Sequence, residues 1–157
     1  MMSITIRSAT PQDAEPVAAL GREFVAYLQG LGDSHPNSLT AEDYLRDGFG
    51  ANPAFAGLIA ELEGQIVGYL LYCPAYDLDF GGRILYIIDL FVREAARRQG
   101  VARALMTRTA DVCREAGGQA LLWSVYTPNK MAKAFYENLG AQYIKDLNFM
   151  YLSMWAT

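Results

Sequence analysis

The six residues from Arg97 to Ala102, Arg-Arg-Gln-Gly-Val-Ala, are of the types that bind phosphate groups where a helix begins. The first turn of a helix has backbone N–H groups without partners and lies at the positive end of the helix dipole. Gly100 leaves room for an anion to approach the backbone, and Ala102 keeps the next turn narrow. No Gly-Lys-Ser/Thr follows, and three glycines at dinucleotide-binding spacing are absent. The segment therefore predicts a pyrophosphate site and excludes nucleotide hydrolysis and hydride transfer.

Basic residues surround this segment, whereas the first part of the chain is acidic. The arginines near it are Arg93, Arg97, Arg98, Arg103, Arg108 and Arg114. Residues 1–92 carry four basic and twelve acidic side chains, and residues 93–157 carry nine basic and five acidic ones. Either one part attracts a cation while the other receives a polyanion, or both are ordinary solvated faces. The acidic part argues against general nucleic-acid binding, which needs a basic face.

The hydrophobic pattern predicts helices and strands that would position the glycine segment. Strands are expected at residues 3–8, 55–61, 65–73, 83–92, 120–126 and 143–154. Helices are expected after Thr10 and at residues 40–50, 99–116 and 129–139, with loops at 30–38 and 74–82. Runs as apolar as RILYIIDLFV at 83–92 are typical of strands covered on both faces. We therefore expect a single domain over residues 1–157, of the α/β (α+β) class, with a mixed sheet between helices.

Composition and single residues exclude several classes of protein. The chain has 157 residues, of which 52% are hydrophobic, so global disorder is excluded. No apolar run reaches the roughly 18 residues that a membrane span needs, and residues 1–10 do not resemble a secretory signal. Cys73 and Cys113 are expected as buried thiols, and the single histidine, His35, has no metal-ligand partners near it. We expect a soluble cytoplasmic protein without a metal.

Arg97-x-x-Gly100-x-Ala102, following a buried strand, resembles the Arg/Gln-x-x-Gly-x-Gly/Ala signature of the GNAT superfamily of N-acetyltransferases. The resemblance spans essentially the whole chain, in the order of elements and in the late Asn129…Tyr136 segment. Residues 39–50, 76–92 and 129–136 are most similar to spermidine/spermine acetyltransferases and their thialysine-acetylating relatives. The resemblance implies a mostly antiparallel twisted sheet of about six or seven strands, splayed between the fourth and fifth. It also implies acetyl-CoA as co-substrate and a homodimer.

The same resemblance implies roles for individual residues. Backbone groups of Leu90, Phe91 and Val92 would pair with the pantetheine arm of acetyl-CoA and polarise its thioester carbonyl. Asn129 would contact the cofactor near its reactive end, and Tyr136 would protonate the departing thiolate. Without the resemblance, Tyr136 would be read as a packing aromatic on an amphipathic helix. The residues implied to hold the pyrophosphate are Arg97, Arg98, Gln99, Gly100, Val101, Ala102 and Arg103.

Asp89 is the candidate acceptor for the proton of the amine. An alkylammonium has a pKa near 10.4, so freeing its lone pair at pH 7 costs about 4.6 kcal/mol. A carboxylate inside an apolar strand is costly unless it has a function or a partner. Asp89 is therefore expected either to accept the proton, directly or through a water, or to be a structural acid bonded to backbone N–H groups or an arginine.

The sequence departs from the polyamine enzymes next to Asp89. Those enzymes carry Glu-Asp at this place in the strand, whereas this chain has Ile88-Asp89. The missing glutamate bears on polyamine specificity and on the family's proton route. Asp77 and Asp79, with Phe80 as an aromatic neighbour, are expected to anchor a distal ammonium group, or to be solvated loop acids.

The resemblance implies direct transfer of acetyl from acetyl-CoA to a primary amine within a ternary complex, and the acidic part of the chain and the loop acids favour a small cationic molecule as substrate. A polyamine, a diamine or a lysine-like amino acid would fit the charge. An acetyltransferase acting on protein amines is the nearest alternative, and a non-catalytic CoA-binding regulator is the alternative from another class.

Overall fold

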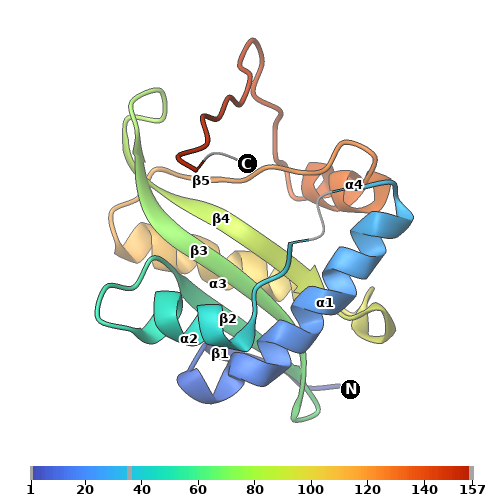
Figure 1. The fold of residues 1–157 in the computed structure, drawn as a ribbon. Coiled ribbons are helices and arrows are strands. Elements are labelled where there is room, and N and C mark those ends of the chain that lie inside the picture. Colours follow the sequence, from blue (N-terminus) through green and yellow to red (C-terminus); the bar gives the residue numbers. More distant parts are fainter. Residues whose placement is uncertain (1, 35–36, 156–157) are drawn as a thin grey trace. The chain divides into compact units, whose positions relative to one another are not determined.

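The computed structural model describes residues 2–34 and 37–155; His35 lies outside these ranges. The chain divides into two compact units, Met1–Ser124 and Val125–Thr157. The first unit is built on a five-stranded sheet with the order β1-β2-β3-β4-β5, in which β1 to β4 are antiparallel and β5 is parallel to β4 (Figure 1). The strands are β1 (Ile4–Ser8), β2 (Ala56–Leu62), β3 (Gln65–Asp77), β4 (Gly82–Val92) and β5 (Ala120–Leu122). The mixed, mostly antiparallel sheet is confirmed, with fewer strands than expected.

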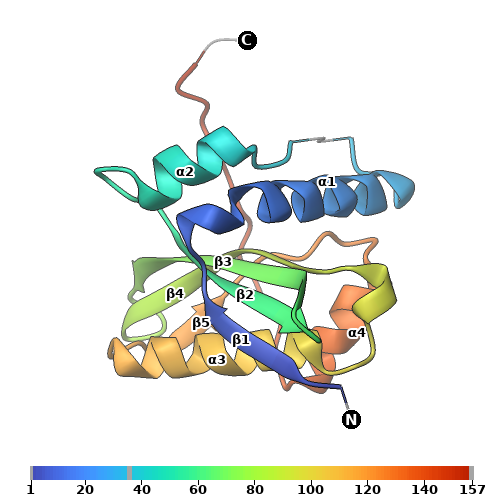
Figure 2. The ribbon, with the colours of Figure 1, turned by 90° about the horizontal axis from the view of Figure 1, so that it is seen from below.

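Helices cover both faces of this sheet, as predicted. Helices α1 (Ala14–Gly30) and α2 (Ala41–Phe49) lie on one face and α3 (Val101–Glu115) on the other (Figure 2). The core under α1 and α2 contains Val17, Leu20, Tyr44, Ile59, Tyr69, Leu71 and Phe91. On the other face, Val101, Leu105 and Thr109 of α3 are buried. Apolar side chains at helical spacing therefore form the buried side of both long helices.

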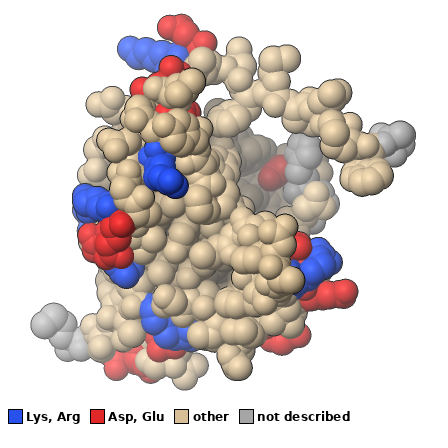
Figure 3. All heavy atoms as spheres, turned by 90° about the vertical axis from the view of Figure 1, so that its left-hand side faces the viewer, with Lys and Arg blue, Asp and Glu red and all other residues tan. Residues whose placement is uncertain are grey.

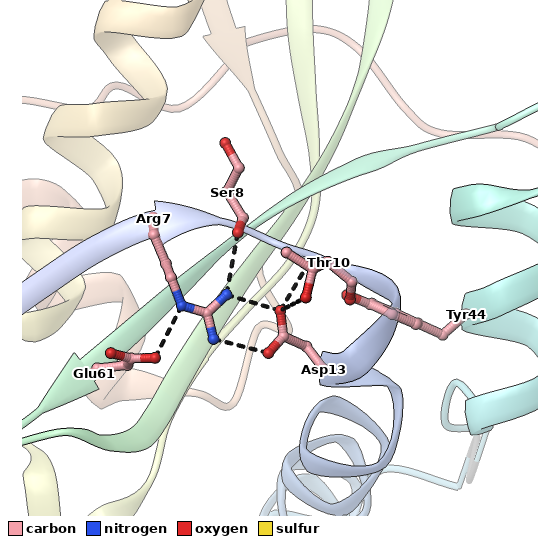
Figure 4. A network of polar contacts seen from close by, with 6 residues as sticks. All are labelled: Arg7, Ser8, Thr10, Asp13, Tyr44 and Glu61. Atoms are coloured by element: carbon pink, nitrogen blue, oxygen red, sulfur yellow. Dashed lines mark hydrogen bonds and ion pairs between the residues drawn. The ribbon is translucent and has the colours of Figure 1, made fainter.

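A polar network fixes the start of α1 against the sheet (Figure 4). The guanidinium of Arg7 donates to both oxygens of Asp13, at 2.8 and 2.9 Å, and its Nε donates to Glu61 at 2.9 Å. Asp13 also accepts the backbone N–H of Thr10 at 2.7 Å and its hydroxyl at 3.1 Å. Tyr44 of α2 donates its hydroxyl to the Thr10 carbonyl at 2.8 Å. The network thus joins β1, β2 and both helices of this face, at the point where the sequence predicted that a helix follows Thr10.

The β3–β4 hairpin is longer than expected. Residues 74–82 were predicted as a loop, but β3 runs to Asp77 and β4 begins at Gly82. The prediction was wrong because Pro74 suggested a break. Pairing of β3 with β2 ends at Tyr72, so Pro74 stands on an open edge, where its missing N–H removes no ladder bond.

Strand β5 is shorter than the predicted 120–126. It pairs with β4 over Ile84–Tyr86 only, and its last partner pair is Tyr86 with Leu122. Two residues further along β4, the β3 register shifts, so that Leu71 opposes Asp89 while Tyr72 opposes Ile87. Ile88 is the extra residue of this β-bulge. Bulges bend a strand and end its pairing, so β5 leaves β4 just before the bulge.

The second unit contains α4 (Lys130–Asn138) within the predicted 129–139 range. The strand expected at residues 143–154 is not formed, which accounts for part of the lower strand count. A strand needs a neighbour for its backbone groups, and no described strand pairs with this segment. Its large side chains remain exposed, with 77% for Phe149, 93% for Met150 and 94% for Tyr151.

Several charged side chains of the first unit are paired locally. Arg46 of α2 binds Asp43 and Asp47, and Arg7 binds Asp13 and Glu61. Basic and acidic side chains are interspersed across the face shown in Figure 3. Within residues 2–34 and 37–155, no helix has the length and apolar character needed to cross a membrane.

Candidate active site

The predicted pyrophosphate loop joins β4 to α3 and has unusual backbone geometry. Arg98 has a φ of 61° and Gly100 a φ of 86°, and α3 begins at Val101. Residues with positive φ near a helix start turn successive N–H groups toward one point. The first i→i−4 bond of α3 is from Ala104 to Gly100. In the described part of the chain, the N–H groups of residues 98–103 donate to no protein acceptor. These groups can receive an anion.

The arginines near this loop fall into two groups. Arg93, Arg108 and Arg114 are paired with Glu23, Glu115 and Asp111, respectively. Arg98 and Arg103 are exposed and form no ion pair with any described carboxylate. Uncompensated positive charge is therefore concentrated at the first turn of α3, where the helix dipole adds to it.

Arg97, the first residue of the signature, turns its side chain inward. Its Nε donates to the Val92 carbonyl at 2.9 Å. Its guanidinium carbon lies 4.9 Å from the ring centroid of Tyr27 and 5.4 Å from that of Phe91. Cation–π contacts and a bond to a carbonyl hold the guanidinium in place. Arg97 therefore ties the loop to the end of β4 and to α1.

The end of β4 exposes backbone groups at one edge. Arg93 donates its N–H to the Val67 carbonyl of β3 at 2.8 Å. Because antiparallel partners alternate between bonded and non-bonded pairs, the backbone of Phe91 is directed to β3. The backbones of Leu90 and Val92 are directed to the opposite edge, where no described strand pairs with residues 87–92. Since Arg97 occupies the Val92 carbonyl, Leu90 keeps both backbone groups available to a ligand.

Asp89 lies next to this edge, on the α1 side of the sheet with Leu71 and Phe91. Its Oδ2 accepts the hydroxyl of Tyr69 at 2.5 Å, and Tyr69 is only 2% exposed. Burial raises the pKa of Asp89 to about 6, against the lowering effect of the Tyr69 hydrogen bond. Burial and the facing carboxylate raise the pKa of Tyr69 well above its usual value. The expected alternative partners, backbone N–H groups or an arginine, are not seen in the described residues.

The bulge determines which side chains face this site. Without the extra residue, Ile87 and Asp89 would point to the same face. With it, Ile87 pairs with Tyr72, and Asp89 joins the face of α1. Ile88, which stands where the polyamine enzymes have glutamate, is 45% exposed at the bulge. An apolar side chain therefore occupies the surface beside the carboxylate.

The loop acids lie at the far tip of the hairpin. Asp77 opposes Gly82 at the tip, whereas Asp89 opposes Leu71, further back along β3. From Leu71 to Asp77, at the strand rise of 3.3 Å per residue, the distance is about 20 Å, so Asp77 and Asp89 are separated by about this length. Asp77 accepts the N–H groups of Asp79 and Phe80 at 2.8 and 3.4 Å. Asp77 therefore shapes the turn. The structure does not bring Asp77, Asp79 or Phe80 to Asp89.

Asn129 and Tyr136 lie in the second unit. The side-chain oxygen of Asn129 accepts the N–H of Ala132 at 3.2 Å, which makes it the N-cap of α4. Tyr136 lies on the same helix, with its ring centroid 5.3 Å from that of Phe135. The Asn-x6-Tyr spacing thus places its first residue at the helix start and its second near the end of the helix.

Two residues in this region were not predicted from the sequence. Tyr69 bonds to Asp89, and Tyr27 lies against Arg97. Tyr69 stands in the apolar run 65–73, and only the strand register shows that it faces an acid 20 positions away. Helical spacing from Phe24 would have placed Tyr27 on the inner side of α1, but its partner depends on how the loop folds back.

Comparisons with known proteins identify the family of the chain. Residues 18–141 match the acetyltransferase (GNAT) family. The thialysine N-epsilon-acetyltransferase of Mus musculus is 34% identical over 150 residues, covering 90% of this chain and 86% of that protein. The spermidine/spermine N(1)-acetyltransferase-like protein 1 of Homo sapiens is 31% identical over 143 residues, covering 87% of this chain and 20% of that protein.

A solved structure shares the fold. An integron cassette protein from the mobile metagenome of V. cholerae superposes with a TM-score of 0.78 at 20% sequence identity, covering 98% of this chain and 94% of that one. The family match, the relatives and the strand–loop–helix site lead to the same assignment. The chain belongs to the GNAT family of acetyltransferases and is an N-acetyltransferase.

Proposed function

We propose that the protein transfers the acetyl group of acetyl-CoA to a primary amine of a small cationic molecule, by direct transfer in a ternary complex. The observation that carries the proposal is the set of unused backbone N–H groups at residues 98–103, adjoining the open edge of β4. Asp89, with a pKa raised to about 6, lies next to that edge. An anion site, an unpaired strand edge and a proton acceptor are the parts that acetyl transfer requires.

The residues present fit acetyl-CoA. The N–H groups of residues 98–103, with Arg98 and Arg103, would hold the pyrophosphate. Leu90 would pair with the pantetheine amides through its backbone, and Val92 would contribute its N–H. When bound, acetyl-CoA supplies an activated thioester. Arg97 would act on the ligand indirectly, by fixing the loop to Val92. Asn129, at the start of α4, would contact the ligand near its reactive end.

Asp89 would accept the proton of the substrate ammonium. At pH 7 a carboxyl group with a pKa of about 6 is roughly 90% ionised. Transfer of a proton to it from an ammonium of pKa ~10.4 is uphill by about 6 kcal/mol. With an ordinary pKa of 3.8 the cost would be about 9 kcal/mol, so burial makes Asp89 a better base by about 3 kcal/mol. Tyr136 would donate its phenolic proton to the departing sulfur.

The substrate class follows from charge and distance. Relatives named for thialysine, spermidine/spermine and ornithine support a small cationic amine as the substrate. The 20 Å estimate between the tip acids and Asp89 exceeds the length of a lysine side chain. Asp77 and Asp79 could meet only the far end of a long polyamine. A lysine-like amino acid or short diamine is therefore favoured, and Ile88 would contact its aliphatic chain.

Three broader features belong to the same proposal. The family match runs across the boundary at Ser124, which supports a single functional domain over residues 1–157. A homodimer would cover the exposed apolar segment at residues 147–155, since large exposed apolar patches mark interaction surfaces. Cys73 and Cys113 are free thiols, as is usual in the reducing cytoplasm that we propose as its location.

The test is thiol release from acetyl-CoA by the purified protein against thialysine, lysine, ornithine, putrescine, spermidine and a lysine peptide. We expect robust turnover with one free amine. Preference for the peptide would indicate a protein acetyltransferase. Tight binding of acetyl-CoA without transfer to any amine would indicate a non-catalytic regulator. This alternative is tested because Ile88 replaces the glutamate of the polyamine enzymes.

The assigned acid has its own test. We expect Tyr136→Phe to lose most turnover while it still binds acetyl-CoA. Tyr143→Phe is the matched control from the same unit, because the Tyr143 hydroxyl is bonded to Glu137 on the surface. Near-normal turnover of Tyr136→Phe would contradict the role.

A further inference from the structure

Tyr69 is fully buried, and among the described residues its hydroxyl group forms one hydrogen bond. It donates to Asp89 Oδ2 at 2.5 Å, from the core side of the sheet. The ring lies in the cluster under α1 with Leu71 and Phe91, where a phenylalanine would fill the same space. A buried hydroxyl is costly unless it is bonded. The hydroxyl is therefore explained by Asp89 and not by packing.

The two oxygens of Asp89 have different surroundings. Oδ2 receives the Tyr69 hydroxyl. Oδ1 has no hydrogen-bond partner among the described residues, and every fully buried side-chain oxygen or nitrogen there has one. Oδ1 is therefore accessible, while Tyr69 is sealed beneath it. The hydrogen bond fixes the carboxylate so that one oxygen faces the core and the other faces the surface.

Helix α1 packs closely over this pair at a glycine. Gly21 faces it, and a Cβ added at this glycine would lie 3.8 Å from the Tyr69 hydroxyl and 3.9 Å from Ser38 Cβ. A longer side chain at Gly21 would reach the hydroxyl or displace the helix. The bulge at Ile88 places Asp89 on the same face of the sheet as Tyr69, so that the two side chains can form this hydrogen bond.

Charged groups near the pair do not compete with this bond. The titratable side chains that β3 and β4 place on this side of the sheet are Tyr69, Cys73, Asp77, Tyr86 and Arg93. Helix α1 carries Glu15, Arg22, Glu23 and Tyr27, and Arg97 lies over the rings of Tyr27 and Phe91. Arg93 and Glu23 neutralise each other in an ion pair, and Arg22 is exposed. Among the described residues, burial and the Tyr69 hydrogen bond are the influences on the pKa of Asp89.

We infer that Tyr69 is a positioning residue for acetyl transfer: its hydroxyl orients Asp89, with Oδ1 toward the amine, and keeps the carboxylate ionised at neutral pH. The inference rests on the proposed function, because it takes Asp89 as the proton acceptor. Burial alone would raise the pKa of Asp89 further and leave less of the carboxylate ionised at pH 7.

The test compares Tyr69→Phe with Tyr44→Phe. Tyr44 belongs to the same buried cluster, but its hydroxyl bonds to the Thr10 carbonyl, so this control loses an equivalent buried hydrogen bond. The carboxyl ¹³C resonances of aspartate-labelled protein are titrated, and that of Asp89 is identified by its loss in Asp89→Asn. We expect a midpoint near pH 6 in the native protein and in Tyr44→Phe. In Tyr69→Phe it should rise by about one pH unit.

Thiol release with thialysine gives the second readout. The acid limb of the pH–rate profile should move upward by the same amount in Tyr69→Phe, so that raising the pH restores turnover. A structural defect would not be restored in this way. An unchanged or lowered Asp89 midpoint in Tyr69→Phe, or an equal shift in Tyr44→Phe, would overturn the positioning role. Normal turnover of Asp89→Asn would overturn the role of Asp89 itself and with it that of Tyr69.

Discussion

Two acidic side chains on the same side of the sheet, Asp13 and Asp89, show how differently one fold can treat a carboxylate. Asp13 receives four hydrogen bonds, two from Arg7 and two from Thr10. The Arg7 hydrogen bond holds the pKa of Asp13 below its usual value. Asp89 receives one, from Tyr69, and burial raises its pKa to about 6.

The difference separates a structural acid from a reactive one. The partners of Asp13 stabilise its charged form and join four elements, so the carboxylate has nothing left to offer a ligand. Asp89 has one accessible oxygen and a weakened preference for the charged form. Strained or incompletely satisfied groups concentrate at functional sites. The number of donors around each acid is therefore a better guide to function than its burial.

The largest expected effect is the loss of activity in Asp89→Asn. Removal of the proton acceptor should lower kcat by about 10²- to 10⁴-fold, as is typical of a general base. The midpoint of thermal unfolding should not fall, because the uncharged amide still accepts the Tyr69 hydroxyl. Thiol release and thermal unfolding measure the two effects. Near-normal kcat would show that Asp89 is as structural as Asp13.

The converse variant, Asp13→Asn, should affect stability and leave activity unchanged. Loss of the Asp13 charge leaves Arg7 with Glu61 as its only carboxylate among the described residues and weakens the hydrogen bonds from Thr10. We expect the free energy of unfolding to fall by about 2 kcal/mol, less than the roughly 3–5 kcal/mol typical of a fully buried pair, because the Arg7 side chain is 33% exposed. Urea unfolding measures the loss, and kcat of the folded fraction should match the native protein. Glu61→Gln is the control, with a smaller loss.

The two acids should respond to pH in opposite directions. The folded-state pKa of Asp13 is lowered, so its stabilisation is present above pH ~4 and is lost as the pH falls further. The folded-state pKa of Asp89 is raised from 3.8 to about 6, so the fold loses stability as the pH rises from about 4 to about 6, where the unfolded chain has released this proton and the folded chain still holds it. Asp89→Asn should therefore be more stable than the native protein by about 1–3 kcal/mol at pH 8 and equal to it near pH 4. A stability difference that does not change with pH would refute the raised pKa.

The smallest expected effect concerns arginines with and without a carboxylate partner among the described residues. Arg98→Gln and Arg103→Gln should each raise KM for acetyl-CoA by about fivefold, and less at high salt. Arg108→Gln is the matched control on α3, since Arg108 is paired with Glu115. Equal effects at Arg98 and Arg108 would show that the unpaired arginines do not define the anion site.

The sequence predicted features that depend on neighbours along the chain. The start of α3 was placed within two residues, and the helix expected after Thr10 is present. The loop between β4 and α3 was recognised because a glycine with positive φ before a helix has a local signature.

Features that depend on strand register were not predictable in this way. The bulge at Ile88, the Tyr69–Asp89 bond and the separation of Asp77 from Asp89 all follow from how β3 pairs with β4. The strand expected at 143–154 is rich in apolar residues, but it lacks a described neighbour with which to form a ladder.

The central claim is that Asp89 accepts a proton with a pKa of about 6 during acetyl transfer. The most direct test is the pH dependence of kcat/KM for the best amine of the panel, which reports ionisations of the free enzyme. The substrate ammonium titrates about four units higher and does not obscure this region. The account predicts a break in slope near pH 6 that is absent from the residual activity of Asp89→Asn. A profile without a break between pH 5 and 7, or one that Asp89→Asn retains, would contradict it.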